Sequence, residues 1–253
     1  MPVDRKIYKV PFFKGEQPEW ICPVCGKGIL GGIKGSFNIN QDKKSGRYEV
    51  EGEIYYVYSC LFICSNSNCR ATVSNTGVGG QDMFLDYANL GEDGEPGVDF
   101  KDIFTPKYFH PHLKIFDVHK DVPGDVVKEL NKSFEVFFCD PSAASGHIRV
   151  ALENLLDSLK VKRFRINNKK RRKLSLHERI ENVPEIYKNL KSDLLAIKWL
   201  GNAGSHPGEV TKDDVMDAYD ILEVVFSELF DKKEYRKAVK QINKKKGPRK
   251  SKA

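Results

Sequence analysis

Hydrophobic spacing in the first half of the chain has a β-like character. Residues 47–64 are rich in Tyr, Val, Ile and Phe with partial alternation, which predicts one long strand or two consecutive strands. Residues 71–77 predict a short closing strand. Residues 78–101 are rich in glycine and acidic side chains and predict a loop. Residues 105–124 hold three prolines and predict an extended linker.

In the second half, apolar residues recur at i, i+3 and i+4, which predicts amphipathic helices. An Asp-Pro pair at 140–141 supplies a cap and a first-turn proline. Ser175 with Glu178, and Thr211 with Asp214, have capping-box spacing. The predicted fold class is therefore α+β, with a small β-rich domain before an all-α bundle of four to five helices. The predicted helices cover about residues 126–138, 141–159, 175–183, 184–201 and 211–229.

Four cysteines in the first half have the spacing of a structural zinc site. Cys22 and Cys25 stand three positions apart just before Gly26, as in a zinc knuckle whose backbone N–H groups point at the sulfur atoms. Cys64 and Cys69 follow after 38 intervening residues. Two such pairs make a closed tetrahedral site with no open position for a catalytic water, so we expect zinc as a structural cofactor.

The other two cysteines are more simply interpreted as core residues than as metal ligands. Cys60 can replace Cys69 as the partner of Cys64, but a buried thiol in the predicted strand is the simpler interpretation. Cys139 ends an apolar helix and belongs in the core. The chain starts without the apolar stretch of a signal peptide and has no run of eighteen apolar residues, so we expect a cytoplasmic protein with no membrane contact. In that reducing compartment, metal ligands are more plausible than disulfides.

Positive charge is concentrated in two runs. Residues 160–173 carry nine Lys or Arg and no acid, and residues 232–252 carry eleven against Glu234 alone. These runs contribute +9 and +10 to a formal net charge of +7, which leaves −12 for the rest of the chain. A polyanion would therefore be held at two places. The plainer alternative is a solvated loop and a frayed tail that keep the protein soluble.

Five segments of the helical part carry a family resemblance: VPGDVVKELNKSFEVF, HIRVALENLLDSL, LHERI, IKWLGNAGSHPGE and DDVMDAYDILEVV. In this order and spacing, the stretch from about Phe116 to Phe230 resembles the domain-of-unknown-function family DUF4145, a branch of the HEPN-like helical bundles. The resemblance covers somewhat under half the chain. It implies a bundle that is often dimeric and occurs in prokaryotic proteins of restriction and anti-phage defence. We accordingly expect a homodimer through the bundle, with a defence-system protein as a further partner.

The resemblance also indicates residues for catalysis. HEPN relatives that cleave RNA use an Arg followed four to six residues later by a His, and no metal. Here His206 matches, but Asn202 stands four positions before it and the nearest upstream cation is Lys198. Arg149 and Glu153 match the family's Arg-x-x-x-Glu. They form an intrahelical salt bridge, or else Arg149 reaches the GNAGSH turn and supplies the missing cation.

We interpret the chain as a zinc-ribbon-like domain joined to a HEPN-like bundle. We expect it to bind nucleic acid, RNA or DNA, through a basic loop at 160–173 and the basic tail, in prokaryotic anti-phage defence or regulation. One rival is a metal-independent ribonuclease centred on His206, and another is a dimerising scaffold without catalysis. The expected parts are a zinc-ribbon-like domain at 1–80, an acidic loop and linker at 81–122, the bundle at 123–231 and a basic tail at 232–253. The expected phosphate-binding residues are Lys162, Arg163, Arg165, Lys169, Lys170, Arg171, Arg172 and Lys173.

Overall fold

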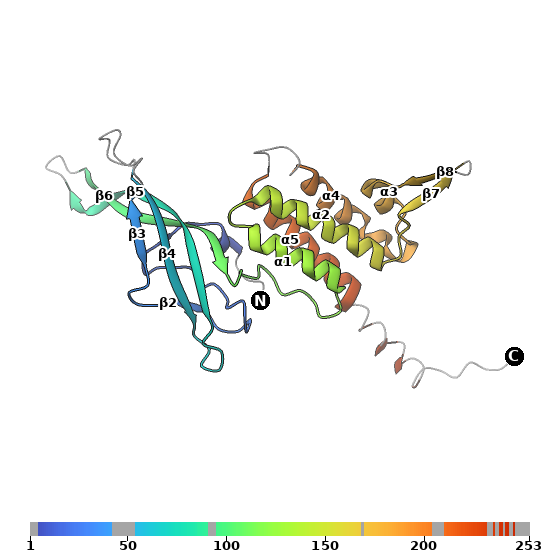
Figure 1. The fold of residues 1–253 in the computed structure, drawn as a ribbon, viewed down its shortest axis with the longest axis horizontal. Helices are drawn as coiled ribbons and strands as arrows, with labels where there is room; N and C mark the ends of the chain where they lie inside the picture. The colour runs from blue at the N-terminus through green and yellow to red at the C-terminus, as the bar shows by residue number, and fades with distance from the viewer. Residues whose placement is uncertain are drawn as a thin grey trace. The chain divides into compact units, whose positions relative to one another are not determined.

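A computed structural model of the chain separates it into two compact units. The first comprises Met1–Ile115 with Phe134–Asp140, and the second comprises Phe116–Ser133 with Pro141–Ala253. The first unit is built on an antiparallel sheet and the second on helices, which confirms the α+β fold class (Figure 1). The structure describes residues 5–41, 54–90, 95–167, 170–203 and 210–231, and in the C-terminal segment residues 235, 238, 239, 241, 242 and 245.

The first unit contains a curled antiparallel sheet with the strand order β1-β6-β5-β4-β2, and β3 pairs with β4 beside β2. A short 3-10 turn, η1 (Arg5–Tyr8), precedes it. The six strands are β1 (Phe12–Phe13), β2 (Leu30–Gly32), β3 (Asn38–Gln41), β4 (Tyr55–Cys64), β5 (Thr72–Leu90) and β6 (Pro96–His110).

Strand β4 shows why this sheet has a core on one face. Its side chains alternate, so that Tyr58, Cys60, Phe62 and Cys64 are buried while the residues between them are exposed or half-buried. The alternation predicted for this segment is thus confirmed from Tyr55 onward. The aromatic rings of this face gather around Trp20, which is fully buried and contacts three of them edge to face. The three rings belong to Phe12, Phe62 and Phe109.

The loop predicted for residues 78–101 was wrong, as was the extended linker predicted to begin at residue 105. Apart from residues 91–95, the stretch from 78 to 110 lies in β5 and β6, and the first unit continues to Ile115 rather than ending at residue 80. The glycines suggested a loop, but they allow neighbouring strands and side chains to approach closely. A Cβ at Gly79 would lie 2.8 Å from the Phe104 ring. Cross-strand backbone pairing outweighs the local turn-like composition here.

The helices of the second unit follow the predicted periodicity closely. Capping boxes at Ser175 and Thr211 are confirmed. The helix predicted for residues 184–201 begins instead as a 3-10 turn, η2 (Glu185–Leu190), before it becomes regular. The α-helices are α1 (Gly124–Val136), α2 (Pro141–Ser158), α3 (Leu176–Glu181), α4 (Lys191–Ala203) and α5 (Lys212–Phe226), and α5 continues into a π turn, η3 (Ser227–Asp231).

A buried polar pair joins three helices inside this bundle. The Ser133 hydroxyl lies 2.6 Å from the Tyr219 hydroxyl and donates to the Ala144 carbonyl oxygen at 2.8 Å, so hydrogen bonds link α1, α2 and α5 in the core. Because each oxygen has a partner, the pair avoids the desolvation cost of an unsatisfied group. No helix within the described residues has the length and apolar character needed to span a membrane.

Candidate metal centre and candidate nucleic-acid interface

Two of the four candidate ligands lie on one tight turn. Cys22 and Cys25 follow Ile21, whose bridge to Ile29 closes the turn from behind. The Gly26 N–H donates to the Cys22 carbonyl oxygen at 2.9 Å, and Gly26 has a positive φ of 64°. Glycine adopts this left-handed conformation without a steric penalty, so the tight turn expected around the two cysteines is present.

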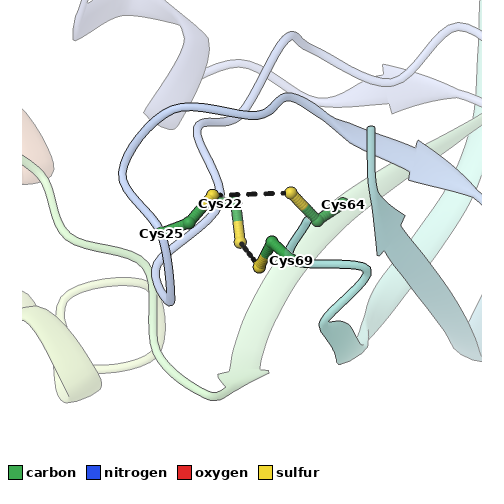
Figure 2. Close-up of side chains that lie close together, drawn as sticks. All are labelled: Cys22, Cys25, Cys64 and Cys69. Carbon is green, nitrogen blue, oxygen red and sulfur yellow. Dashed lines mark hydrogen bonds between the residues drawn. The ribbon is translucent and has the colours of Figure 1, made fainter. Parts of the chain in front are cut away.

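The second pair comes from the opposite side of the site. Cys64 ends β4, and Cys69 lies on the turn that follows, where its N–H donates to the Asn66 carbonyl oxygen at 2.9 Å. All four Sγ atoms point toward one another and lie within 4.8 Å (Figure 2). The four cysteines predicted as ligands are therefore brought together, and Cys60 lies outside the cluster.

The sulfur spacing fits a tetrahedral metal. The Sγ atoms of Cys22 and Cys69 are 3.9 Å apart, and those of Cys25 and Cys64 are 3.6 Å apart. Four sulfurs bound to one zinc ion at about 2.3 Å would be separated by about 3.8 Å. Both distances are far beyond a disulfide bond of about 2 Å, and all four thiols are free. The cluster is compatible with a zinc site made of four thiolates.

Backbone groups prepare one of these thiols for ionisation. Hydrogen bonds from the backbone N–H groups of Gly28 and Lys27 lower the pKa of Cys25 to about 6, with the Gly28 nitrogen 3.5 Å from the sulfur. Burial, in contrast, raises the pKa of Cys64 to about 12. A bound cation would favour the thiolate of both residues, which is the state that binds metal.

Gly28 is a site residue that the sequence reasoning did not single out. A Cβ at this position would lie 2.4 Å from Cys64 Sγ and 2.9 Å from the backbone nitrogen of Asn66. Any larger side chain would therefore push the two cysteine pairs apart. The available signal was the second glycine in the segment Cys25-Gly-Lys-Gly28.

The basic segment at 160–173 contains a β-hairpin, which corrects the loop predicted for it. Strand β7 (Phe164–Asn167) pairs with β8 (Lys170–Lys173), and the hairpin projects from one end of the helical unit (Figure 1). Its register places Phe164 opposite Lys173 and Arg165 opposite Arg172. β7 alternates apolar and polar residues only over its four positions, and β8 consists of four charged residues, so the basic composition outweighed this short signal.

Ion pairs fasten the base of the hairpin to the helices. Asp157 at the end of α2 binds both Arg163 and the buried Arg179, whose Nη2 lies 2.6 Å from the carboxylate. The Arg172 guanidinium binds Glu178 through two nitrogens, at 2.6 and 3.1 Å. These arginines lower the pKa of both carboxyls, that of Glu178 to about 2, with Arg172 the main cause. Asp157 and Arg179 were not foreseen as part of this region.

The remaining cations of the hairpin region have no acidic partner among the residues that the structure describes. Of the eight predicted phosphate-binding residues, Arg163 and Arg172 are thus held by acids, and Lys169 lies outside the described residues. The Arg171 guanidinium instead lies over the Phe164 ring, 3.7 Å from its centroid. The side chains without such an acid are those of Lys162, Arg165, Lys170, Arg171 and Lys173.

The tentative catalytic residues are only partly brought together. Arg149 lies against α4, since a Cβ at Gly201 would approach the Arg149 Cβ to 3.1 Å. Arg149 Nε is 3.8 Å from Glu153, the predicted intrahelical pair. Lys198 is 7% exposed, with its Nζ 3.2 Å from the Trp199 ring centroid, and burial followed by the Arg149 charge lowers its pKa.

Two of the candidate catalytic residues, Asn202 and His206, belong to the GNAGSH segment. His206 and the side chain of Asn202 lie outside the described residues. The composite ribonuclease site therefore stays a prediction, and loss of RNA cleavage in His206→Ala is the measurement that would support it.

Comparison with known proteins finds two family matches. Neither the search of curated proteins nor that of solved structures found a match. Residues 10–109, which include all four clustered cysteines, match the family described as Domain of unknown function (DUF8608). Residues 131–245, which include the basic hairpin, match the family described as Domain of unknown function (DUF4145).

Proposed function

We propose that the protein binds nucleic acid through the β7–β8 hairpin, with its amino-terminal unit held together by zinc. The main support for this proposal is the register of the hairpin, in which Arg165 lies directly opposite Arg172. Like charges in this position destabilise a two-stranded ribbon. Glu178 binds one of the two arginines, and a phosphate backbone would supply the counter-charge for the other.

The surroundings of the hairpin support a polyanion over a small anion. Every residue of β8 is exposed, so four successive cations face solvent. The rest of the chain is acidic once the two basic runs are excluded, which directs a polyanion to these runs. Arginine is also suited to phosphate because its planar guanidinium offers a fork of donors. We infer that the hairpin contacts several phosphates of one strand.

The role that we propose for zinc is structural. Cys22, Cys25, Cys64 and Cys69 would fill all four positions of a tetrahedral ion, which leaves none for substrate or water. When bound, zinc supplies the positive charge that keeps the thiolates ionised and cross-links two segments of the chain. These are the knuckle before β2 and the turn between β4 and β5. The homodimer and the defence-system partner that the family resemblance implies stay predictions.

Salt-dependent binding tests the nucleic-acid proposal. We would measure fluorescence anisotropy of a labelled RNA of about 30 nucleotides between about 50 and 200 mM salt. Replacing Lys170, Arg171 and Lys173 with Gln should lower the affinity on the order of 10- to 100-fold and flatten the salt dependence, because released counterions drive such binding.

A matched variant controls for net charge. Lys34→Gln, Lys107→Gln and Lys114→Gln remove the same three charges from the first unit, and the affinity should change little. Equal losses in both variants, or binding that ignores salt, would contradict the proposal. Dimerisation without affinity for nucleic acid would leave the scaffold alternative.

A further inference from the structure

A groove runs along one side of the hairpin. It encloses about 940 Å³, close to the upper end of the range of about 300–1,000 Å³ that ligand pockets span. The hairpin contributes Phe164, Arg165 and Ile166 to its lining, and Asn182 and Pro184 come from the segment after α3. The groove therefore lies between the projecting ribbon and the body of the helical unit.

Apolar side chains are exposed in this groove among cations. Ile166 is 75% exposed and Phe164 is 39% exposed, although both lie on a strand that otherwise carries polar side chains. A two-stranded ribbon has no core of its own that could bury them. Residues i and i+2 of a strand share a face, so the two side chains form one apolar patch. Such a patch beside cations suits a ligand with both flat apolar surfaces and negative charge.

Phe164 already shows the stacking geometry that a nucleobase would use. The planar Arg171 guanidinium lies over its ring at 3.7 Å from the centroid. Unpaired bases stack in the same manner on aromatic rings and guanidinium planes. Ring and guanidinium together therefore form a stacking element on an exposed strand.

One lysine that lines the groove has an unfavourable backbone conformation. Lys160 has φ of 60°, in the left-handed region, two positions after the last residue of α2. The Val161 N–H donates to the Leu156 carbonyl oxygen at 2.9 Å, which is the bond that closes a Schellman motif. Glycine is the usual residue at this position because it has no Cβ. A lysine there is expected where its side chain serves a purpose, and here it lines the groove.

The acid in the groove is already neutralised. Among the described lining residues, Glu178 is the one carboxylate, and it accepts hydrogen bonds from Arg172 and from the Ser175 N–H at 2.9 Å. The cations Lys160, Lys162 and Arg165 line the same groove. Its electrostatic character is therefore positive.

Resting on the nucleic-acid binding proposed above, we propose that this groove takes single-stranded rather than duplex nucleic acid. Unpaired bases lie against Phe164 and Ile166, and phosphates lie near the three cations. In a duplex the bases are stacked on one another, so the apolar patch would have nothing to contact. Splayed bases, in contrast, present their faces, and stacking on them is largely independent of sequence.

The test compares three forms of one oligonucleotide. Full-length protein is titrated into labelled single-stranded RNA of about 20 nucleotides, single-stranded DNA of the same sequence, and the corresponding DNA duplex, at about 100 mM salt. The single strands should bind on the order of 10-fold tighter than the duplex. Phe164→Ala with Ile166→Ala should lower single-strand affinity on the order of 10-fold and duplex affinity less than about twofold.

A matched variant separates stacking from general loss of apolar surface. Ile186→Ala with Val224→Ala removes two side chains of the same unit that are 71% and 55% exposed and lie outside the groove, so affinity should not change. Phe164→Leu keeps the apolar character but removes the ring, and it should retain only part of the single-strand preference. Circular dichroism and the melting temperature confirm folding of each variant.

The outcomes distinguish this inference from the proposal it rests on. Equal affinity for duplex and single strand, or equal losses of both in Phe164→Ala with Ile166→Ala, would overturn the single-strand inference and leave nucleic-acid binding intact. Failure to bind any of the three oligonucleotides would overturn both. Competition by polyglutamate as effective as that by unlabelled RNA would also overturn both, because it would show a general preference for acidic polymers.

Discussion

The β5–β6 and β7–β8 hairpins differ in which side chains lie opposite each other. In β5–β6, Asp82 lies opposite Lys101, and the apolar pair Leu85 and Val98 lies further along the same ladder. The Lys101 ammonium also lies 4.9 Å from the centroid of the Phe84 ring. Each of these pairs favours the hairpin, because opposite charges and apolar side chains in register attract one another.

In β7–β8 the register has the opposite effect. Arg165 meets Arg172, and both aromatic and aliphatic side chains of β7 meet cations: Phe164 lies opposite Lys173, and Ile166 opposite Arg171. The Arg171 guanidinium over the Phe164 ring is favourable, as the Lys101–Phe84 contact is in β5–β6. The opposed arginines are not, and the second hairpin also depends on ion pairs to α2 and α3 at its base. Sequences that oppose their own local stability tend to mark functional sites. The difference supports a ligand-binding role for β7–β8.

Loss of the metal site should have the largest effect, and it should fall on the first unit. Cys64→Ser removes one ligand at the end of β4, so we expect loss of metal and unfolding of the sheet that contains β5–β6, because structural zinc contributes on the order of 10 kcal/mol in small domains. Metal analysis and thermal melting of the full chain measure both. A strong chelator should reproduce the effect.

Cys60→Ala is the control for this change. Its sulfur lies outside the cluster and within 3.8 Å of the Asn75 side-chain oxygen, so metal content should be retained. A full complement of zinc in Cys64→Ser together with loss of zinc in Cys60→Ala would contradict the assigned ligand set.

Reversing one charge in β7 should separate stability from binding. Arg165→Glu places an acid opposite Arg172, so we expect the hairpin to gain about 0.2–1 kcal/mol while nucleic-acid affinity falls on the order of 10-fold. Chemical denaturation and anisotropy titration measure the two quantities. Tighter nucleic-acid binding by this variant would contradict the proposed role of Arg165.

The reciprocal change in β5 should affect stability alone. Asp82→Lys places two lysines opposite each other in β5–β6, so the free energy of unfolding should fall by about 0.2–1 kcal/mol. Nucleic-acid affinity should rise no more than in a control variant that carries one additional lysine elsewhere in the first unit. A gain in affinity that matches the loss in Arg165→Glu would show that net charge, rather than the hairpin, determines binding.

The smallest expected effect is on the stability of the protein at acidic pH. Arg172 lowers the pKa of Glu178 from its ordinary 4.5 to about 2. Its stabilising contribution is therefore fully present above about pH 4.5 and is lost as the pH falls toward about 2. Glu178→Gln keeps the capping geometry without the charge, so its difference in urea midpoint from the unchanged protein should narrow over this pH range. A constant difference would argue against the ion pair.

Most helices of the second unit could be predicted from local sequence. The periodicity located the bundle helices, and the capping boxes at Ser175 and Thr211 form as predicted, because both depend on residues within one or two turns. The helical segment predicted for 184–201 is present, but its first part, Glu185–Leu190, is a 3-10 turn that precedes α4. Such details depend on packing against other helices.

The strands were harder to predict from the sequence, because strand partners can be distant along the chain. Residues 78–101 have the composition of a loop, and their ladder forms only because β5 finds β6 over a long register. In the hairpin at 164–173, alternation extends only over the four residues of β7, while β8 is wholly charged, so the signal was weak. The close approach at Gly28 is likewise a property of the assembled turn.

Cysteine spacing was sufficient to propose the four candidate ligands, with Cys60 as the alternative to Cys69, because two thiols three positions apart can meet on a tight turn. Charge counting was sufficient to locate the basic run at 160–173. Only the folded chain decided that Cys69 rather than Cys60 completes the cluster, and that like charges face each other across β7 and β8. Both outcomes depend on strand register, which is set by long-range pairing and not by neighbouring residues.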